Sequence, residues 1–225
     1  MAYEIYCIDP AVHTPEKDTY LKIKSLAPKP FRMSYHLPAL ENWQKILEYQ
    51  KKNPPQAVII LGSSSSVYDQ SPWQDMLRTW IQKLIDHQVP LLGICYGHQL
   101  ILHLFGSKIC SLPQKQMGSR IIKFSNTSFL KKTAKTMEVV VSHQEIVMDL
   151  PKEFITFASS FLIPIEATYH RSLPIFTIQG HPEATALFCK NQAISLHEDH
   201  LCFRDGSHFL KSILSIFYKY IKKRG

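Results

Sequence analysis

The chain has 225 residues, of which 45% are hydrophobic and 20% are charged, a composition typical of a globular protein and not of a disordered or fibrous one. No apolar run reaches the roughly 18 residues of a membrane span, and the first residues lack the pattern of a secretion signal. The length suits one domain with a large core, residues 1–225. Five scattered cysteines without a Cys-x-x-Cys pair argue against a disulfide framework and predict a reducing, cytoplasmic compartment.

The formal net charge is +8, which permits weak attraction to anionic partners. The basic residues are spread along the chain, however, and the one dense run, Lys222-Lys223-Arg224, is typical of a solvated tail. No nucleic-acid-binding motif accompanies that run. We therefore expect neither nucleic acid nor a membrane among the partners.

The first half of the chain alternates short apolar strands with amphipathic helices. Residues 10–38 carry five prolines and little periodicity, which predicts an irregular segment with one strand over Phe31–Tyr35. The other predicted strands are Tyr3–Ile8, Ala57–Leu61 and Pro90–Cys95, and the predicted helices are Ala39–Lys52, Trp73–His87 and Gln99–Phe105. This order predicts a parallel sheet with helices on both faces and a ligand site at the carboxyl ends of its strands.

The second half is richer in strands. They are expected over Ser107–Ser111, Ser119–Phe124, Met137–Val141, Phe154–Ser159, Ile163–His170 and Pro174–Gln179, with helices over Pro182–His197 and Phe209–Lys222. The last helix has an apolar stripe, which predicts a core-facing side; a membrane-binding helix is the alternative. The stripe consists of Phe209, Leu210, Ile213, Leu214, Phe217, Tyr220 and Ile221.

Cys95 stands between a predicted strand and the helix after it, with Gly93 and Gly97 two residues away on either side. A strand that turns directly into a helix over a nucleophile needs small neighbours, because the turn is tight. At the N-terminus of the helix, backbone N–H groups and the helix dipole favour a thiolate and can stabilise an oxyanion. A buried structural cysteine is the ordinary interpretation of an isolated cysteine. The Gly-x-Cys-x-Gly setting favours a nucleophile instead.

A cysteine nucleophile requires a base, and histidine is the usual one because its pKa lies near neutrality. His181 follows an apolar strand and precedes a proline, which favours an extended backbone. Glu183, two residues later, then points to the same side and can hold the imidazole tautomer. His98 and His103 are expected to pack along their helix. A metal site at residues 197–200 (His-Glu-Asp-His) lacks a third ligand at a recognisable spacing.

Four segments together resemble the class I (triad) glutamine amidotransferases, in the order found in that family. Residues 93–99 (Gly-Ile-Cys-Tyr-Gly-His-Gln) resemble the nucleophile motif, and residues 179–183 (Gln-Gly-His-Pro-Glu) resemble the His-Pro-Glu motif. Residues 142–145 (Ser-His-Gln-Glu) are similar to the Ser-His-x-Asp segment of GMP synthase-type and free-standing members. Residues 58–69 are similar to the glycine-turn loop that supplies an oxyanion donor.

The resemblance implies a flavodoxin-like three-layer α/β sandwich with a mostly parallel central sheet and a smaller strand-rich second half. It also implies a catalytic triad of Cys95, His181 and Glu183, with no metal and no cofactor. The backbone N–H groups of Tyr96 and Ser63 would form the oxyanion hole. The substrate-binding residues implied by the family pattern are Gly62, Gln99, Ser142 and His143.

The sequence departs from the family at three places. The family loop reads Gly-Gly-Pro or Gly-Ser-Pro, whereas here it reads Gly62-Ser63-Ser64; the missing proline predicts a looser turn and low basal turnover. A phosphate-binding loop is a poor alternative for these serines, because no Gly-Lys-Ser/Thr ending follows. Glu145 replaces the usual aspartate, which leaves the partner of His143 undefined. Residues 116–118 (Gln-Met-Gly) lack the acidic residue of the family's Glu-x-Gly turn.

The function implied is hydrolysis of a γ-carboxamide through a cysteinyl γ-glutamyl thioester, with release of ammonia. The substrate would be glutamine or another γ-glutamyl amide. The chain would be either one subunit beside a separate ammonia-acceptor synthase or a free-standing hydrolase, and a homo-oligomer is compatible with both. A γ-glutamyl peptidase of the same fold is one alternative. A non-catalytic regulatory or binding module is another, which the intact Cys, His and Glu argue against.

Overall fold

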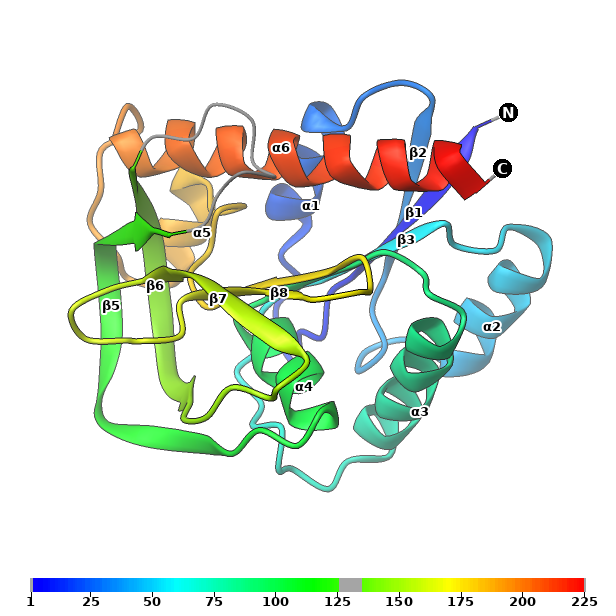
Figure 1. Ribbon diagram of the computed structural model, residues 1–225, viewed down its shortest axis with the longest axis horizontal. Helices are drawn as coiled ribbons and strands as arrows, with labels where there is room; N and C mark the ends of the chain where they lie inside the picture. The colour runs from blue at the N-terminus through cyan, green and yellow to red at the C-terminus, as the bar shows by residue number, and fades with distance from the viewer. Residues whose placement is uncertain (1, 126–134, 225) are drawn as a thin grey trace.

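The computed structural model describes residues 2–125 and 135–224, and the strands of these residues form one nine-stranded sheet in the order β2-β1-β3-β4-β9-β8-β7-β5-β6 (Figure 1). The strands are β1 (Tyr3–Ile8), β2 (Phe31–His36), β3 (Ala57–Ile60), β4 (Leu91–Ile94), β5 (Ile109–Phe124), β6 (Thr136–Val147), β7 (Phe154–Ser159), β8 (Ala167–His170) and β9 (Ile175–Ile178). The helices are α1 (Lys17–Leu26), α2 (Trp43–Lys52), α3 (Pro72–Asp86), α4 (Tyr96–Leu104), α5 (Ala186–Asn191) and α6 (Leu201–Arg224).

The sheet has a parallel half and an antiparallel half. Strands β2, β1, β3, β4 and β9 pair in parallel, as the alternation of strands and helices predicts. Beyond β9, each of β8, β7, β5 and β6 pairs antiparallel with its neighbour. The expected α/β sandwich with a strand-rich second half is confirmed.

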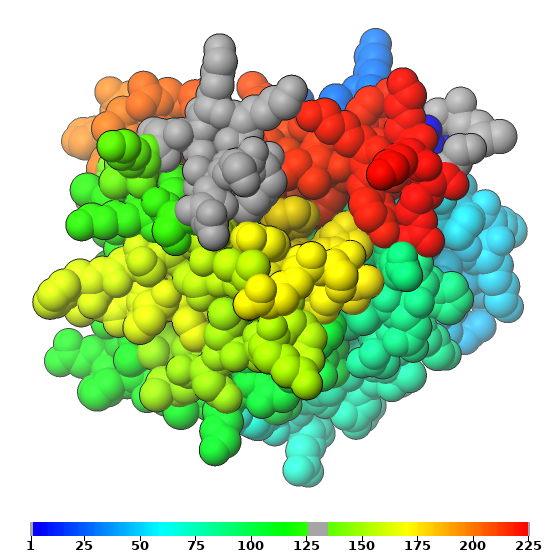
Figure 2. Space-filling model, viewed as in Figure 1, coloured from blue at the N-terminus to red at the C-terminus, as the bar shows by residue number. Residues whose placement is uncertain are grey.

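Helices cover the parallel half on both faces, because buried side chains alternate along its strands. Ile5 and Cys7 of β1 face a core shared with α1 and α6, whereas Tyr6 and Ile8 face a core shared with α2, α3 and α4. Helix α6 crosses one side of the sheet in Figure 1, with α3 and α4 on the other. The space-filling view shows the red part of α6 beside yellow residues of the second half of the chain (Figure 2).

The apolar stripe of the last helix packs in the core. Six of its seven residues are buried in the cluster that joins α6 to the sheet: Phe209, Leu210, Ile213, Leu214, Phe217 and Ile221. The seventh, Tyr220, is only half-buried. The core-facing interpretation is therefore correct, and the stripe is not available as a membrane-binding surface. Among the described residues, no helix is both long and apolar enough to cross a bilayer.

Several expected elements have different bounds. Helix α1 occupies part of the segment expected to be irregular; only Thr19, Tyr20 and Ile23 of it are buried, a stripe too sparse to show as periodicity. Strand β5 is continuous where two strands were expected, with a register shift between Ser111 and Gln116. Only Ala186–Asn191 of the helix expected over Pro182–His197 is helical, and α6 begins at Leu201, not at residue 209.

The order of strands gathers the sequence motifs at one edge. Strand β4 lies between β3 and β9, with Ile60 paired to Gly93 and Ile94 paired to Ile178. The loop after β3, the turn after β4 and the segment after β9 therefore leave the sheet side by side at the carboxyl ends of neighbouring strands. Strand β6 reaches the same place from the antiparallel half, because Val140 forms a bridge with His181.

Candidate active site

Cys95 occupies a strained turn between β4 and α4. Its backbone has φ 52° and ψ −103°, a left-handed conformation that is uncommon for a residue with a side chain. A Cβ atom on Gly93 would lie 2.4 Å from the Gly97 carbonyl oxygen, and one on Gly97 would lie 2.4 Å from the Ile60 carbonyl oxygen. Both glycines are therefore needed for the chain to fold back so closely, as the sequence predicts for a nucleophile elbow.

His181 and Glu183 form a buried pair beside this turn. His181 Nδ1 lies 2.8 Å from Glu183 Oε1, and the two side chains are 4% and 2% exposed. The other ring nitrogen, Nε2, has no hydrogen-bond partner among the described residues. Because the carboxylate accepts the Nδ1 proton, Nε2 is the nitrogen left to exchange a proton with a nucleophile or a leaving group.

Gly62 brings the pair and the cysteine together. A Cβ atom built on Gly62 would lie 2.8 Å from His181 Cε1 and 3.5 Å from Cys95 Cβ. The side chains of His181 and Cys95 therefore converge on the space left by the missing side chain of Gly62. Burial lowers the pKa of His181, but the negative charges of Cys95 and Glu183 outweigh burial and raise that pKa well above its usual value. The ring is thus suited to hold a proton beside a thiolate.

Hydrogen bonds from serine side chains hold the loop that lacks the family proline. Ser63 Oγ donates to the Pro10 carbonyl oxygen at 2.7 Å and accepts from the Ser65 N–H at 3.1 Å. Ser66 Oγ donates to Glu145 Oε1 at 2.8 Å, and Gln74 Nε2 donates to the Ser66 carbonyl oxygen at 2.8 Å. These bonds argue against the loose turn that the missing proline predicts.

We expect Ser63→Ala to lower turnover of a γ-carboxamide substrate roughly tenfold, less than the loss of an oxyanion donor itself, because the backbone N–H remains but the loop that aims it loses two hydrogen bonds. Ser64→Ala, at an exposed position in the same loop, is the matched control. Steady-state measurement of kcat for both variants checks this expectation. Equal kcat for Ser63→Ala and the wild type would show that the hydroxyl does not organise the loop.

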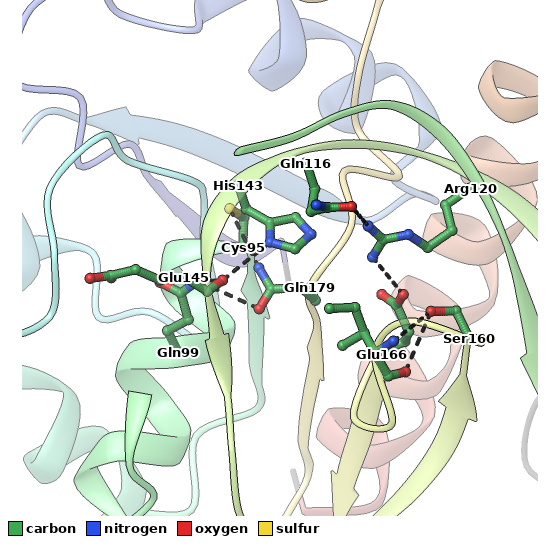
Figure 3. Close-up of polar contacts among 10 residues, drawn as sticks. Cys95, Gln99, Gln116, Arg120, His143, Glu145, Ser160, Glu166 and Gln179 are labelled. Atoms are coloured by element: carbon green, nitrogen blue, oxygen red, sulfur yellow. Dashed lines mark hydrogen bonds and ion pairs between the residues drawn. The ribbon is translucent and has the colours of Figure 1, made fainter. Parts of the chain in front are cut away.

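Gln99, His143 and Glu145 meet at one backbone carbonyl (Figure 3). Gln99 Nε2 donates to the Glu145 carbonyl oxygen at 2.8 Å, and His143 Nδ1 lies 3.2 Å from the same oxygen. Burial, followed by the charges of Arg120 and His181, lowers the pKa of His143 to about 3, so its ring is neutral. Gln179 Nε2 lies 3.8 Å from Cys95 Sγ, which joins this group to the nucleophile.

A cavity of about 740 Å³ opens over these residues. Its lining includes every residue of the expected triad and Gly62, Ser63, Gln99, Ser142 and His143. Tyr96 is fully buried; its N–H stands in the first turn of α4, where amides have no partner within the helix. His98 packs as expected, with Nδ1 2.7 Å from Thr177 Oγ1.

The sequence did not point to two further walls of the cavity. One is the loop after β1, residues 11–16, and the other is the end of α5 at Asn191 and Gln192. Asp9 shapes the first wall by accepting hydrogen bonds from the N–H groups of Ala11 and Glu16. The rule that ligands bind at the carboxyl ends of parallel strands could have found this loop, because β1 lies next to β3. No sequence signal marks Gln192, because it belongs to none of the recognised motifs. Its side-chain oxygen accepts a hydrogen bond from Ser142 Oγ at 3.0 Å.

The burial of Glu16, in the wall formed by residues 11–16, can be tested through the pH dependence of stability. Burial, then the charges of Asp9 and Glu183, raise the pKa of Glu16 from 4.5 to about 7. An acid whose pKa is raised by folding favours the folded state while both states are protonated, and this advantage is lost as the pH rises from 4.5 to about 7. We therefore expect Glu16→Gln to raise the Tm by a few degrees at pH 8 and to leave it nearly unchanged at pH 4.5, as measured by thermal unfolding. A Tm shift of the same size at both pH values would contradict this origin.

Comparison with known proteins assigns the chain to a family. The family model for glutamine amidotransferase class-I matches residues 24–194. The chain belongs to the class I glutamine amidotransferases. A GMP synthase [glutamine-hydrolyzing] of Bacillus pumilus is 29% identical over 174 residues, covering 77% of this chain and 33% of that protein. One from Helicobacter pylori is 33% identical over 138 residues, covering 61% of this chain and 26% of that protein.

Solved structures agree in fold. A glutamine amidotransferase from Thermotoga maritima superposes with a TM-score of 0.74 at 17% identity, covering 98% of both chains. A glutamine amido transferase from Methylobacillus flagellatus gives a TM-score of 0.74 at 15% identity, covering 97% of this chain and 95% of the other. At such identities the likeness establishes the fold alone. The present amidotransferase chain spans about a third of the length of the Bacillus relative.

The structure shows what contacts Glu145 and Gln116, two residues at which the sequence departs from the family pattern. In this amidotransferase the Glu145 carboxylate binds Ser66, so His143 uses the Glu145 backbone and not its side chain. Gln116 Oε1, where the family has an acid, accepts from Arg120 at 3.1 Å, and Arg120 pairs at 2.9 Å with the buried carboxylate of Glu166 (Figure 3). Glu166, which is distant from Arg120 in the sequence, therefore supplies the negative charge that pairs with Arg120. Among the described residues, no group of His, Cys, Asp and Glu could hold a metal ion, including residues 197–200.

Proposed function

We propose that this chain hydrolyses the γ-carboxamide of glutamine, with Cys95 as nucleophile, His181 as acid and base, and Glu183 as the group that orients His181. The observation that carries the proposal is the pairing of His181 Nδ1 with buried Glu183, next to a cysteine on a strained strand-to-helix turn. A binding module that retained only the fold would have no need for this strain or for a buried ion pair.

The reaction follows from these positions. The Cys95 thiolate attacks the carboxamide carbon, and the negative charge that develops on the oxygen faces the N–H groups of Tyr96 and Ser63. His181, protonated at Nε2, gives that proton to the nitrogen, the C–N bond breaks, and ammonia leaves a γ-glutamyl thioester on Cys95. His181 then takes a proton from water as water attacks the thioester, which yields glutamate and restores the thiolate.

The substrate-binding residues proposed are Gly62, Gln99, Ser142 and His143, all of which line the cavity. His143 is neutral and Gln99 is held by the Glu145 carbonyl, so both can present fixed polar atoms to a zwitterionic amino acid. By analogy with the glutamine-hydrolysing GMP synthases it resembles, we propose that the chain delivers ammonia to a separate acceptor synthase.

The size of the cavity favours a second candidate substrate. A volume of about 740 Å³ is ample for a drug-sized ligand and exceeds what free glutamine needs. A γ-glutamyl amide with a larger amine would use the walls formed by residues 11–16 and by Gln192. Ammonia or amine release should be measured for glutamine and for a series of γ-glutamyl amides, with labelling of Cys95 by a glutamine-analogue electrophile. Absence of both release and labelling for every substrate would refute the enzymatic proposal.

A further inference from the structure

The segment that carries the proposed base is a short turn with little regular structure of its own. The His181 N–H donates to the Val140 carbonyl oxygen at 2.7 Å, and the Ala184 N–H donates to the His181 carbonyl oxygen at 3.2 Å. The carbonyl groups of Pro182 and Ala184 belong to the residues on either side of Glu183. What they contact decides how firmly Glu183 is aimed at His181.

Lys22 of α1 binds both carbonyl groups. Its Nζ donates to the Ala184 carbonyl oxygen at 2.6 Å and to the Pro182 carbonyl oxygen at 3.2 Å, across about 160 residues of sequence. The ammonium also lies 5.8 Å from the centroid of the Phe203 ring on α6. One side chain thus ties α1 to the residues immediately before and after Glu183.

Helix α6 also packs against this turn. A Cβ atom on Gly206 would lie 2.2 Å from the Pro182 carbonyl oxygen, so the α6 backbone packs directly on Pro182. The turn is therefore held by the hydrogen bonds of the Lys22 ammonium and by a helix backbone that leaves no room for a side chain at Gly206. Loss of the ammonium would remove both of these hydrogen bonds and leave the Ala184 carbonyl oxygen without its Lys22 contact.

The charges around Lys22 are consistent with this contact. Burial lowers the pKa of Lys22, and the negative charge of Glu183 is the largest effect opposing burial. The other titratable groups that act on Lys22 are Asp18 on its own helix, Cys189 on α5 and Cys202 on α6. A partly buried ammonium destabilises the folded state unless hydrogen bonds such as those to the Pro182 and Ala184 carbonyl oxygens replace the water it loses.

We infer that Lys22 is a positioning residue for the triad, which holds the Pro182–Ala184 backbone so that Glu183 stays aimed at His181 Nδ1. This inference rests on the proposed function only for its effect on turnover; the geometry it describes is independent of the substrate. Lys22 is not among the residues that line the cavity, and its hydrogen bonds go to the residues on either side of Glu183, so its effect on the site is transmitted through Glu183 and His181.

The test compares Lys22→Met with Lys24→Met, a matched control on the same helix whose ammonium lies 5.6 Å from the Tyr20 ring, away from the turn. With glutamine, or the best γ-glutamyl amide found, Lys22→Met is expected to lower kcat about tenfold or more while KM changes less than about threefold. Lys22→Arg, which keeps the charge and the donors, should recover part of the lost kcat, and Lys24→Met should match the wild type. Wild-type kcat in Lys22→Met would overturn the inference.

A second measurement does not depend on turnover. The proton on His181 Nδ1 should give a downfield NMR resonance, assigned by its absence in His181→Ala, and Lys22→Met should shift or broaden it while Lys24→Met leaves it in place. An unshifted resonance in Lys22→Met would refute the positioning role even if the enzyme proved active. A shifted resonance in a protein that releases no ammonia would uphold the positioning role and refute the proposed function. If Lys22→Met does not fold, Lys22→Gln, with its amide donor, gives the same comparison.

Discussion

Cys95→Ser is expected to reduce ammonia release by at least about 1,000-fold and to leave the fold intact. Serine nearly matches the volume of cysteine, so the tight turn between Gly93 and Gly97 can accept it. Its hydroxyl is far less acidic than a thiol and is not a nucleophile at neutral pH without stronger activation. Initial rates of ammonia release and intact-protein mass spectrometry of the γ-glutamyl thioester measure the loss of chemistry, and circular dichroism with thermal unfolding measures whether the fold is intact.

The chain offers its own control for this substitution. Cys110 is an exposed cysteine on β5, and Cys110→Ser makes the same chemical change away from the turn. We expect Cys110→Ser to retain wild-type turnover and to form the thioester. Turnover by Cys95→Ser equal to that of Cys110→Ser would remove Cys95 from the mechanism.

The strand-to-helix turn at Cys95 could be predicted from the sequence because the residues that determine it are neighbours in the chain. Gly93 and Gly97 stand two residues from Cys95, and the steric need for both is a property of one turn. The alternation of strands and helices then placed the loops after β3 and β4 at a common edge. The pairing of His181 with Glu183 was predicted for the same reason, since the two residues are only two apart in the chain. The extended backbone expected after His181 was wrong, because residues 182 and 183 form a turn in which the Ala184 N–H donates to the His181 carbonyl oxygen at 3.2 Å.

The remaining parts of the site depend on contacts between distant segments. Helix α1 has few apolar residues, and Lys22 acquires its role only when α1 packs near the residues after β9. The Glu145 carboxylate could not be assigned because its partner, Ser66, lies 79 residues away. The missing proline predicts a loose loop after β3, but the Ser63 hydroxyl holds this loop by donating to the carbonyl oxygen of Pro10, a residue of the loop after β1. Hydrogen bonds between distant segments hold the loop in place of the proline, and such bonds cannot be predicted from the residues of the loop alone.

His181→Ala is expected to lower kcat/KM for the amide roughly 100-fold or more, because the leaving nitrogen then departs without a proton donor. Glu183→Gln is expected to cost less, since a carboxamide oxygen can still accept from Nδ1 but cannot stabilise the imidazolium. Folding raises the pKa of His181 through the charges of Cys95 and Glu183, against the effect of burial. Removing the Glu183 charge should therefore lower the pKa of His181. On the alkaline side of the pH profile, kcat/KM should then begin to fall at a lower pH than in the wild type.

His143 is the histidine against which this assignment is tested, because it lines the same cavity. Its Nδ1 meets a backbone carbonyl and not a carboxylate, and burial together with the Arg120 and His181 charges lowers its pKa to about 3. A ring held neutral in this way is a poor source of the proton that the leaving ammonia needs. His143→Ala should therefore raise KM and leave the single-turnover rate at saturating substrate within about tenfold of the wild type. A loss in that rate as large as the loss in His181→Ala, with normal binding, would contradict the assignment of His181 over His143 as the acid.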